Sequence, residues 1–124
     1  AASDFILMPS KFEPCGLPQM IAPLYGSLPV AFDTGGIHDT IADLDLDAET
    51  GNGFLFDFFD SEALFWAVTR AVHFFEQPEA VKARHRDRIM RQSRKRFNHS
   101  VTASQYIDLY EKMLKRPLIN RKPI

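Results

Sequence analysis

The chain has 124 residues, of which 45% are hydrophobic, and this size and composition fit one globular domain or a part of one. The apolar content is too high for a disordered chain, and no run of 18 apolar residues is present that would predict a membrane span. The single cysteine excludes an intrachain disulfide, and the first residues lack a basic, cleavable leader. We therefore expect a cytoplasmic protein.

The formal net charge of -1 hides a strong division along the chain. Residues 12–69 contain ten acidic side chains and no Lys or Arg, whereas residues 70–124 contain 14 basic and five acidic side chains. Such a division is found in proteins with a nucleic-acid or membrane face, in chains whose halves attract each other, and in surfaces matched to a further domain. The basic residues between 82 and 96 go around a predicted helix with few aromatic neighbours, so we expect no nucleic-acid and no membrane partner.

The amino-terminal half predicts short strands separated by glycine-containing loops. Residues 4–8 are an apolar run typical of a buried strand, and residues 17–25 have a helical pattern that Gly26 ends. Pro23 removes a backbone donor and should kink or shorten this helix. Residues 28–32 predict a second strand, Thr34-Gly35-Gly36 a second glycine turn, residues 43–50 an exposed acidic loop, and residues 53–56 a third strand.

The carboxyl-terminal half predicts three helices. Asp60 or Ser61 is the expected N-cap of the first, whose apolar residues recur at helical spacing until Pro78. A second helix should cover residues 79–96, and Ser100 should cap a third that runs to about residue 115.

This order of elements predicts an α/β fold with a Rossmann-like parallel sheet. Ligands of such sheets bind at the carboxyl ends of the strands, and both glycine loops follow strands. We expect a single partial domain, with a ligand-binding part in residues 1–60 and a helical part in residues 61–116.

Residues 9–18 form the most informative segment. A strand, a glycine-containing loop and a helix place backbone amides where an anion such as a phosphate is favoured. Glu13 adds one carboxylate beside that anion site, which is electrostatically unfavourable unless the carboxylate has a function. The alternative is that Glu13 is a solvated loop residue.

Four motifs resemble bacterial glycogen synthases and plant starch synthases. Residues 9–17 read Pro-Ser-Lys-Phe-Glu-Pro-Cys-Gly-Leu and are similar to the Pro-Ser-Arg-Phe-Glu-Pro-Cys-Gly-Leu signature of that family. Residues 25–30, 34–41 and 51–56 resemble its Tyr-Gly-Thr-x-Pro-Ile/Val, Thr-Gly-Gly-Leu-x-Asp-Thr-Val and Gly-x-Gly-Phe-x-Phe segments, in the same order.

The resemblance implies the last part of the second domain of a GT-B glycosyltransferase, an enzyme fold with two Rossmann-like domains. Such an enzyme transfers glucose from a nucleoside diphosphate glucose, here ADP-glucose rather than UDP-glucose, to the non-reducing end of an α-1,4-glucan with retention. Glu13 matches the family glutamate that contacts the donor glucose. The resemblance implies two sets of substrate-binding positions. The amides of Cys15, Gly16 and Leu17 face the glucose and phosphates, and Thr34, Gly35 and Gly36 lie in a second loop that lines the same cleft. The alternative for the second loop is a turn without a binding role.

Three positions depart from the pattern. The wider group of retaining GT-B enzymes has a second glutamate eight positions after the first, where this chain has Ile21; glycogen and starch synthases commonly lack it as well. Pro18 cannot donate an amide to a ligand, and Lys11 replaces an Arg and loses its bidentate geometry.

The expected partners are the donor, the glucan acceptor and an amino-terminal GT-B domain, and the chain alone should be inactive. No cofactor and no metal are expected, because the four histidines are dispersed and the acidic run lacks the spacing of a calcium loop. An exposed sheet edge would offer a site for a homo-oligomer or a swapped dimer. Two alternatives stay open: another retaining GT-B enzyme of the sucrose or trehalose type, and a non-catalytic module that binds nucleotide sugar or glucan.

Overall fold

The computed structural model describes residues 2–118. Contacts divide the chain into two compact units, Ala1–Ser93 and Arg94–Ile124. The predicted boundary near residue 60 is therefore not where the contacts divide the chain, and the expectation of a single partial domain stays a prediction. The first unit holds the whole sheet and both glycine loops.

The first unit is built on a three-stranded parallel sheet in the order β1-β2-β3. The strands are β1 (Phe5–Met8), β2 (Leu28–Phe32) and β3 (Phe54–Phe56), with Phe5 opposite Leu28 and Val30 opposite Phe54. The predicted α/β class and parallel sheet are confirmed. Because β2 is central, it is buried along most of its length, whereas β1 and β3 form the two edges of this sheet.

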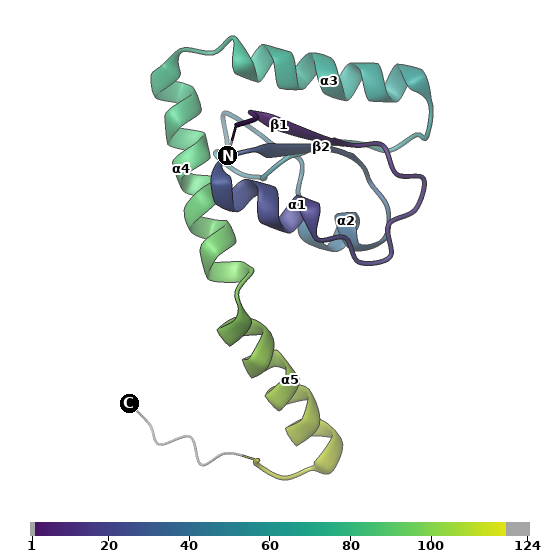
Figure 1. Cartoon of the computed structure of the whole chain (residues 1–124), viewed down its shortest axis with the longest axis vertical. Helices are drawn as coiled ribbons and strands as arrows, with labels where there is room; N and C mark the ends of the chain where they lie inside the picture. Colours follow the sequence, from purple (N-terminus) through teal and green to yellow (C-terminus); the bar gives the residue numbers. More distant parts are fainter. Residues whose placement is uncertain (1, 119–124) are drawn as a thin grey trace. The chain divides into compact units, whose positions relative to one another are not determined.

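Alternate side chains of the strands point to the two faces of the sheet, and each face has its own core. Phe5, Val30 and Phe54 belong to the core under α3 (Ser61–Phe75), together with Ile89 of α4 (Glu79–Arg96). The opposite face carries Met8 and Ala31, packed against Ile37 and Ile41. In Figure 1, α3 accordingly covers one side of the sheet, and α1 and α2 lie on the other.

The first crossover contains the predicted break at proline. It begins as α1 (Pro18–Ile21) and continues as the 3₁₀ helix η1 (Ala22–Tyr25), and Gly26 ends it in the left-handed region at φ 83°. Pro23 lies at the start of η1 and lacks the amide that a longer α-helix would need. The shortening that the sequence predicts is confirmed.

The second glycine segment is a helix rather than only a turn. Thr34 is extended, and α2 (Gly35–Thr40) begins directly after it. A sequence that starts with two glycines reads as a turn, but Ile37 is fully buried and the Ile41 amide donates to its carbonyl at 2.8 Å. Burial of the apolar side of this segment selects the helix, so our prediction of a turn alone was wrong.

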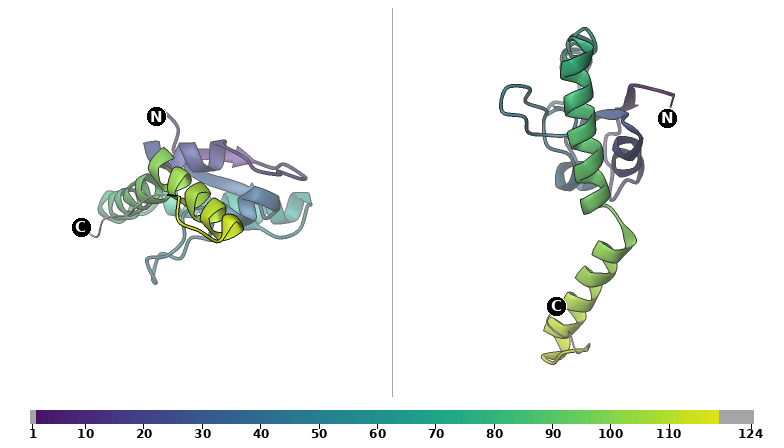
Figure 2. Two further views of the ribbon diagram at one scale, coloured as in Figure 1. Left: turned by 90° about the horizontal axis from the view of Figure 1, so that it is seen from below. Right: turned by 90° about the vertical axis from the view of Figure 1, so that its left-hand side faces the viewer.

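The acidic and basic halves attract each other within the first unit. Arg84 of α4 lies 3.1 Å from Glu49 of the acidic loop, and the Arg88 guanidinium donates to the Gly51 carbonyl at 2.9 Å. Arg70 of α3 pairs with Asp43 at 2.8 Å. Each exposed pair contributes at most about 1 kcal/mol, but together they anchor the loop between α2 and β3. In the right-hand view of Figure 2 this loop projects on the side opposite the amino terminus.

The helices of the second half begin and end close to the predicted residues. Asp60 caps α3, as expected, by accepting from the Ala63 amide at 2.8 Å, and α4 covers Glu79–Arg96 as predicted. The second unit contains α5 (His99–Leu114), whose N-cap is Asn98 and not Ser100. Asn98 is extended and accepts from the Val101 amide at 3.0 Å, whereas Ser100 already lies inside the helix. Within residues 2–118 every helix is too short or too polar to cross a lipid bilayer.

His85 is an unusual core residue, since its side chain is 1% exposed and neither ring nitrogen has a hydrogen-bond partner among the described residues. Its ring packs edge-on against Phe74, with centroids 6.2 Å apart. Burial lowers the pKa of His85 below 6.5, and the nearby guanidinium groups of Arg88 and Arg84 lower it further. Burial thus disfavours the protonated form of this ring in the folded chain.

We predict that the free energy of unfolding falls as the pH drops below about 6.5, because the unfolded chain then binds a proton that the folded core rejects. The slope contributed by His85 is at most about 1.4 kcal/mol per pH unit, the value for one bound proton. Urea unfolding at pH 7.5 and pH 5.5 should show this loss, and His85→Leu should remove most of it. His99→Asn, at an exposed position of α5, should keep the original slope. A full pH-dependent loss in His85→Leu would contradict the assignment.

Candidate functional site

The two glycine loops predicted to line one site lie against each other. They follow the adjacent strands β1 and β2 and so leave the sheet at the same edge. The Gly36 amide donates to the Glu13 carbonyl at 2.8 Å, which joins the loop of residues 9–17 to the start of α2. The sequence spacing could not reveal this bond, because the two residues lie 23 positions apart.

Glycine is required at both positions of this contact. A Cβ atom on Gly35 would lie 2.2 Å from the Glu13 carbonyl oxygen, and one on Gly36 would lie 2.0 Å from the Cys15 carbonyl oxygen. Gly35 also has φ +47°, a conformation that other residues adopt at a cost. The Gly36 amide is engaged within the protein, so the predicted ligand contact of Gly36 must use other atoms. Gly35 and Gly36 thus hold the loops together, whatever they contribute to a ligand.

Gln19 supports the loop from beneath. Its side chain is fully buried, and its Nε2 donates to the Cys15 carbonyl at 3.0 Å and to the Thr40 hydroxyl at 3.3 Å. A Cβ atom on Gly16 would collide with this side chain, since it would lie 2.4 Å from Gln19 Oε1. Sequence analysis missed Gln19 and Thr40, although a polar residue on the buried side of a short helix was a usable signal.

Three successive amides of the loop are free to bind an anion. Among residues 2–118, no acceptor receives the amide hydrogens of Cys15, Gly16 or Leu17. Gly16 has φ +67°, which turns the chain tightly just before Pro18 opens α1. Since α1 has only four residues, the loop amides, more than a helix dipole, would stabilise a bound phosphate.

The Glu13 carboxylate is also available. The residue is half-buried and its carbonyl is fixed by Gly36, yet its carboxylate makes no hydrogen bond or ion pair within the described part of the chain. Cys15 is exposed as a free thiol, and Leu17 has 63% of its surface exposed. The arrangement combines a loop with free amides and an unpaired carboxylate whose backbone position is fixed.

A histidine and an aspartate that sequence analysis did not join form a pair at the second loop. His38 Nδ1 lies 2.8 Å from the Asp33 carboxylate, with Asp33 directly after β2 and His38 on α2. The hydrogen bond that the ring donates to the Asp33 carboxylate, followed by the negative charge of that carboxylate, raises the pKa of His38 above 6.5. The protonated ring and Asp33 then form an ion pair whose charges balance.

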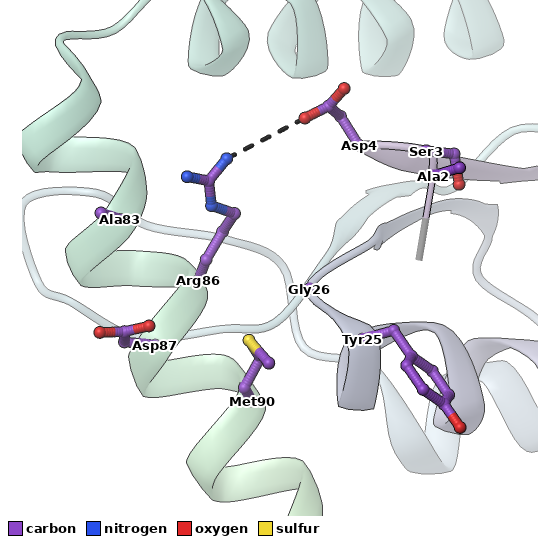
Figure 3. A pocket seen from close by; sticks show the side chains of 9 residues that line it. All are labelled: Ala2, Ser3, Asp4, Tyr25, Gly26, Ala83, Arg86, Asp87 and Met90. Carbon is purple, nitrogen blue, oxygen red and sulfur yellow. Dashed lines mark ion pairs between the residues drawn. The ribbon is translucent and has the colours of Figure 1, made fainter.

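Three hollows of the first unit are lined mainly by residues outside these loops. One of about 310 Å³, shown in Figure 3, lies beside Gly26 at the opposite end of β2 and includes Arg86 and Asp4, 4.0 Å apart. Arg86 also pairs with Glu79, so its charge is balanced. A second, of about 300 Å³, lies beside Pro9 and Phe59, and the third lies along α3. Within residues 2–118 no group of three His, Cys, Asp or Glu side chains is arranged to hold a metal.

No family model matches the sequence. The chain is 39% identical over 116 residues to a glycogen synthase of Geobacillus thermodenitrificans and 41% identical over 117 residues to one of Thermosipho africanus. Each alignment covers 94% of this chain.

A solved structure agrees with these relatives. The catalytic domain of starch synthase IV from Arabidopsis thaliana, bound to ADP and acarbose, matches with a TM-score of 0.77 and 37% identity over 93% of this chain. Over nearly all of its length, the chain is similar to one portion of glycogen and starch synthases. The resemblance of the four motifs is thus confirmed, as is the α/β fold of part of a GT-B enzyme.

The similarity covers only part of each relative. The chain spans 23% of the length of each of these glycogen synthases and of the solved starch synthase chain. The roles of Glu13, of Cys15 to Leu17 and of Thr34 to Gly36 stay predictions.

We predict that Gln19→Met loosens the loop without unfolding the chain. The substitution keeps the length of the side chain but removes the donor to the Cys15 carbonyl, and a net hydrogen bond contributes about 1 kcal/mol. Hydrogen exchange of the Gly36 amide should become roughly five- to tenfold faster, since opening of the loop exposes it. Gln105→Met, at an exposed position of α5, should leave this exchange unchanged. An unaltered Gly36 exchange rate in Gln19→Met would mean that Gln19 does not hold the loop.

We predict that Asp33→Asn lowers the pKa of His38, because the charge and most of the hydrogen-bond strength are lost together. Proton NMR of the His38 ring should show the original pKa above 6.5 and the variant pKa closer to 6.5. Asp47→Asn, in the acidic loop, is the control and should not move it. Equal titration in the original and Asp33→Asn chains would show that the pair does not form in solution.

Proposed function

We propose that the chain forms the donor-binding, carboxyl-terminal part of a glycogen or starch synthase. The enzyme would transfer glucose from ADP-glucose to the non-reducing end of an α-1,4-glucan with retention. The observation that carries the proposal is the loop of residues 13–17, where an unpaired carboxylate and three free amides lie together in a chain similar to glycogen and starch synthases. A cytoplasmic location remains part of the proposal.

The loop amides would bind the diphosphate of the donor. As the bond to glucose breaks, negative charge grows on the leaving diphosphate, and amides fixed beforehand stabilise that charge without reorganisation. The amides of Cys15, Gly16 and Leu17 are suited to this because no protein acceptor competes for them. Pro18 supplies no amide, so binding ends at Leu17.

Glu13 would hold the glucose. A carboxylate accepts hydrogen bonds from sugar hydroxyls, and its negative charge favours the oxocarbenium character that the ring develops. Because the Gly36 amide fixes the Glu13 carbonyl, the carboxylate starts from a defined backbone position. Thr34 and Gly35 would line the same site from the second loop.

The rest of the enzyme would supply the contacts to donor and acceptor that this portion does not contain. The relatives are about four times longer than the chain, and a further GT-B domain would provide the remaining diphosphate contacts and the acceptor site. The chain by itself should therefore not transfer glucose. A homo-oligomer or swapped dimer through the β1 edge is a secondary possibility that the free edge of the sheet favours.

A non-catalytic module is the alternative that the limited coverage of the relatives favours. Such a module would bind a nucleotide sugar or a glucan through the same loops and transfer nothing. Another retaining GT-B enzyme is less favoured, because the relatives described above are glycogen and starch synthases.

We predict that Glu13→Gln separates binding of the sugar from binding of the nucleotide. In NMR titrations of the chain, the amides of residues 15–17 should shift with both ADP and ADP-glucose. The variant should bind ADP as before but bind ADP-glucose more weakly, because only the glucose contacts Glu13. In a protein that joins the chain to the remaining portion of a relative, turnover should fall by roughly 100-fold or more.

Glu62→Gln is the matched control, since Glu62 is an exposed glutamate in the first turn of α3. It should change neither binding nor turnover. Donor binding without turnover in the joined protein would favour the module. Absence of any shift at residues 15–17 with either nucleotide would refute the donor site, and transfer by the chain alone would refute the need for a further domain.

A further inference from the structure

Asn52 joins the end of α2 to the segment before β3. Its Oδ1 accepts from the Ala42 amide at 2.7 Å, and its Nδ2 donates to the Thr40 carbonyl at 3.2 Å. The Asn52 amide adds a third bond, to the Ala42 carbonyl at 2.9 Å. Asn52 lies at the amino ends of the parallel strands, whereas the loops of the proposed donor site follow the carboxyl ends. It is therefore not placed to contact a donor that those loops bind.

This position requires an amide side chain. One side chain must accept from one backbone group and donate to another, and Asn does both, whereas Asp lacks the donor. Because α2 has only six residues, it would not be stable as an isolated helix, and the bonds at its end help to fix it. Arg88 of α4 donates to the carbonyls of Thr50 and Gly51, at 3.2 and 2.9 Å, and so holds the backbone that carries Asn52. Asn52 is thus a fixed anchor for α2.

The Thr40 hydroxyl divides this connection into two branches. It donates to the Gly36 carbonyl and accepts from Gln19 Nε2 at 3.3 Å, which one hydroxyl can do at the same time. On the first branch, the Gly36 amide donates to the Glu13 carbonyl at 2.8 Å. On the second, Gln19 Nε2 donates to the Cys15 carbonyl at 3.0 Å. Both branches therefore end on the loop that carries the carboxylate and the free amides.

The Gln19 branch depends closely on Thr40. Gln19 is fully buried, and its Oε1 has no hydrogen-bond partner among residues 2–118. The two bonds of Nε2 therefore orient the side-chain amide, and hydrogen bonds are electrostatically strong in such buried surroundings. A shift of Thr40 should move the Gln19 amide and, with it, the Cys15 carbonyl.

We propose that Asn52 is a positioning residue of the donor site, which acts through Thr40 on the carbonyls of Glu13 and Cys15. The inference rests on the proposed function, because that function assigns the loop of residues 13–17 to the donor. Groups that are already in place lose less entropy when they bind, so a loop held by Asn52 binds the donor more tightly. Loss of the bond to Thr40 should weaken binding of ADP about three- to tenfold, although no group that contacts ADP is removed.

Asn52→Asp tests this role with little change of shape. It keeps an acceptor for the Ala42 amide but replaces the donor to the Thr40 carbonyl by a carboxylate oxygen. In NMR titrations followed at residues 15–17, the variant should bind ADP about three- to tenfold more weakly than the original chain. Gln105→Glu makes the same change from amide to carboxylate at an exposed position of α5 and should bind ADP as the original chain does. Equal ADP binding by Asn52→Asp and the original chain would overturn the proposal.

A double-mutant cycle tests whether the effect passes through Thr40. Thr40→Val has nearly the shape of Thr40 but lacks the hydroxyl, so it should also weaken ADP binding, whereas Thr40→Ser keeps the hydroxyl and should retain most of the affinity. If Asn52 acts through that hydroxyl, Asn52→Asp should change ADP binding by less than roughly twofold in the Thr40→Val chain. Effects of the two substitutions that simply multiply would contradict the proposal, because a general loss of stability gives that result.

Hydrogen exchange of the original chain provides an answer if circular dichroism shows that a variant does not fold. The Ala42 amide, bonded to Asn52, and the Gly36 amide, bonded to Glu13, should open together and share one dependence on urea below the unfolding transition. Both should exchange faster than the buried Leu28 amide, which donates to the Asp4 carbonyl at 2.9 Å in the pairing of β1 with β2. Different urea dependences of the Ala42 and Gly36 amides would overturn the coupling.

These outcomes are distinct from those of the donor experiments. Absence of ADP shifts at residues 15–17 in the original chain would refute the donor site and, with it, the role of Asn52. Shifts that are present in the original chain and reach half-saturation at the same ADP concentration in Asn52→Asp would refute only the role of Asn52.

Discussion

The hydrogen bond from the Gly36 amide to the Glu13 carbonyl is the constraint on which the site depends. At 2.8 Å it joins the loop after β1 to the helix after β2, and it forms only because neither Gly35 nor Gly36 has a side chain to separate them. Gln19 strengthens the same junction from the buried side by holding the Cys15 carbonyl. The amides of Cys15, Gly16 and Leu17 have no acceptor among residues 2–118, so they remain available to a ligand.

The sheet provides the rigidity that this junction requires. Alternate strand residues fill two separate cores, one under α3 and one under α2, so β2 is supported from both faces. The loops at the carboxyl ends of the strands can then turn tightly at glycines that have positive φ angles. The basic side chains of α3 and α4 serve a different purpose, because they hold the acidic loop beside β3.

The sequence by itself determined the order of the elements, the parallel sheet, the break at Pro23 and the family, because each depends on local patterns or on motifs of adjacent residues. It could not determine that Gly35 starts a helix, that Asn98 caps α5, or that Gln19 and Thr40 support the loop. These features depend on which side of a segment becomes buried and on groups far apart in the chain. Only the tertiary structure decided that Glu13 and Gly36 meet and that Asp33 holds His38, since both pairs arise when the chain folds and its loops come within hydrogen-bonding distance.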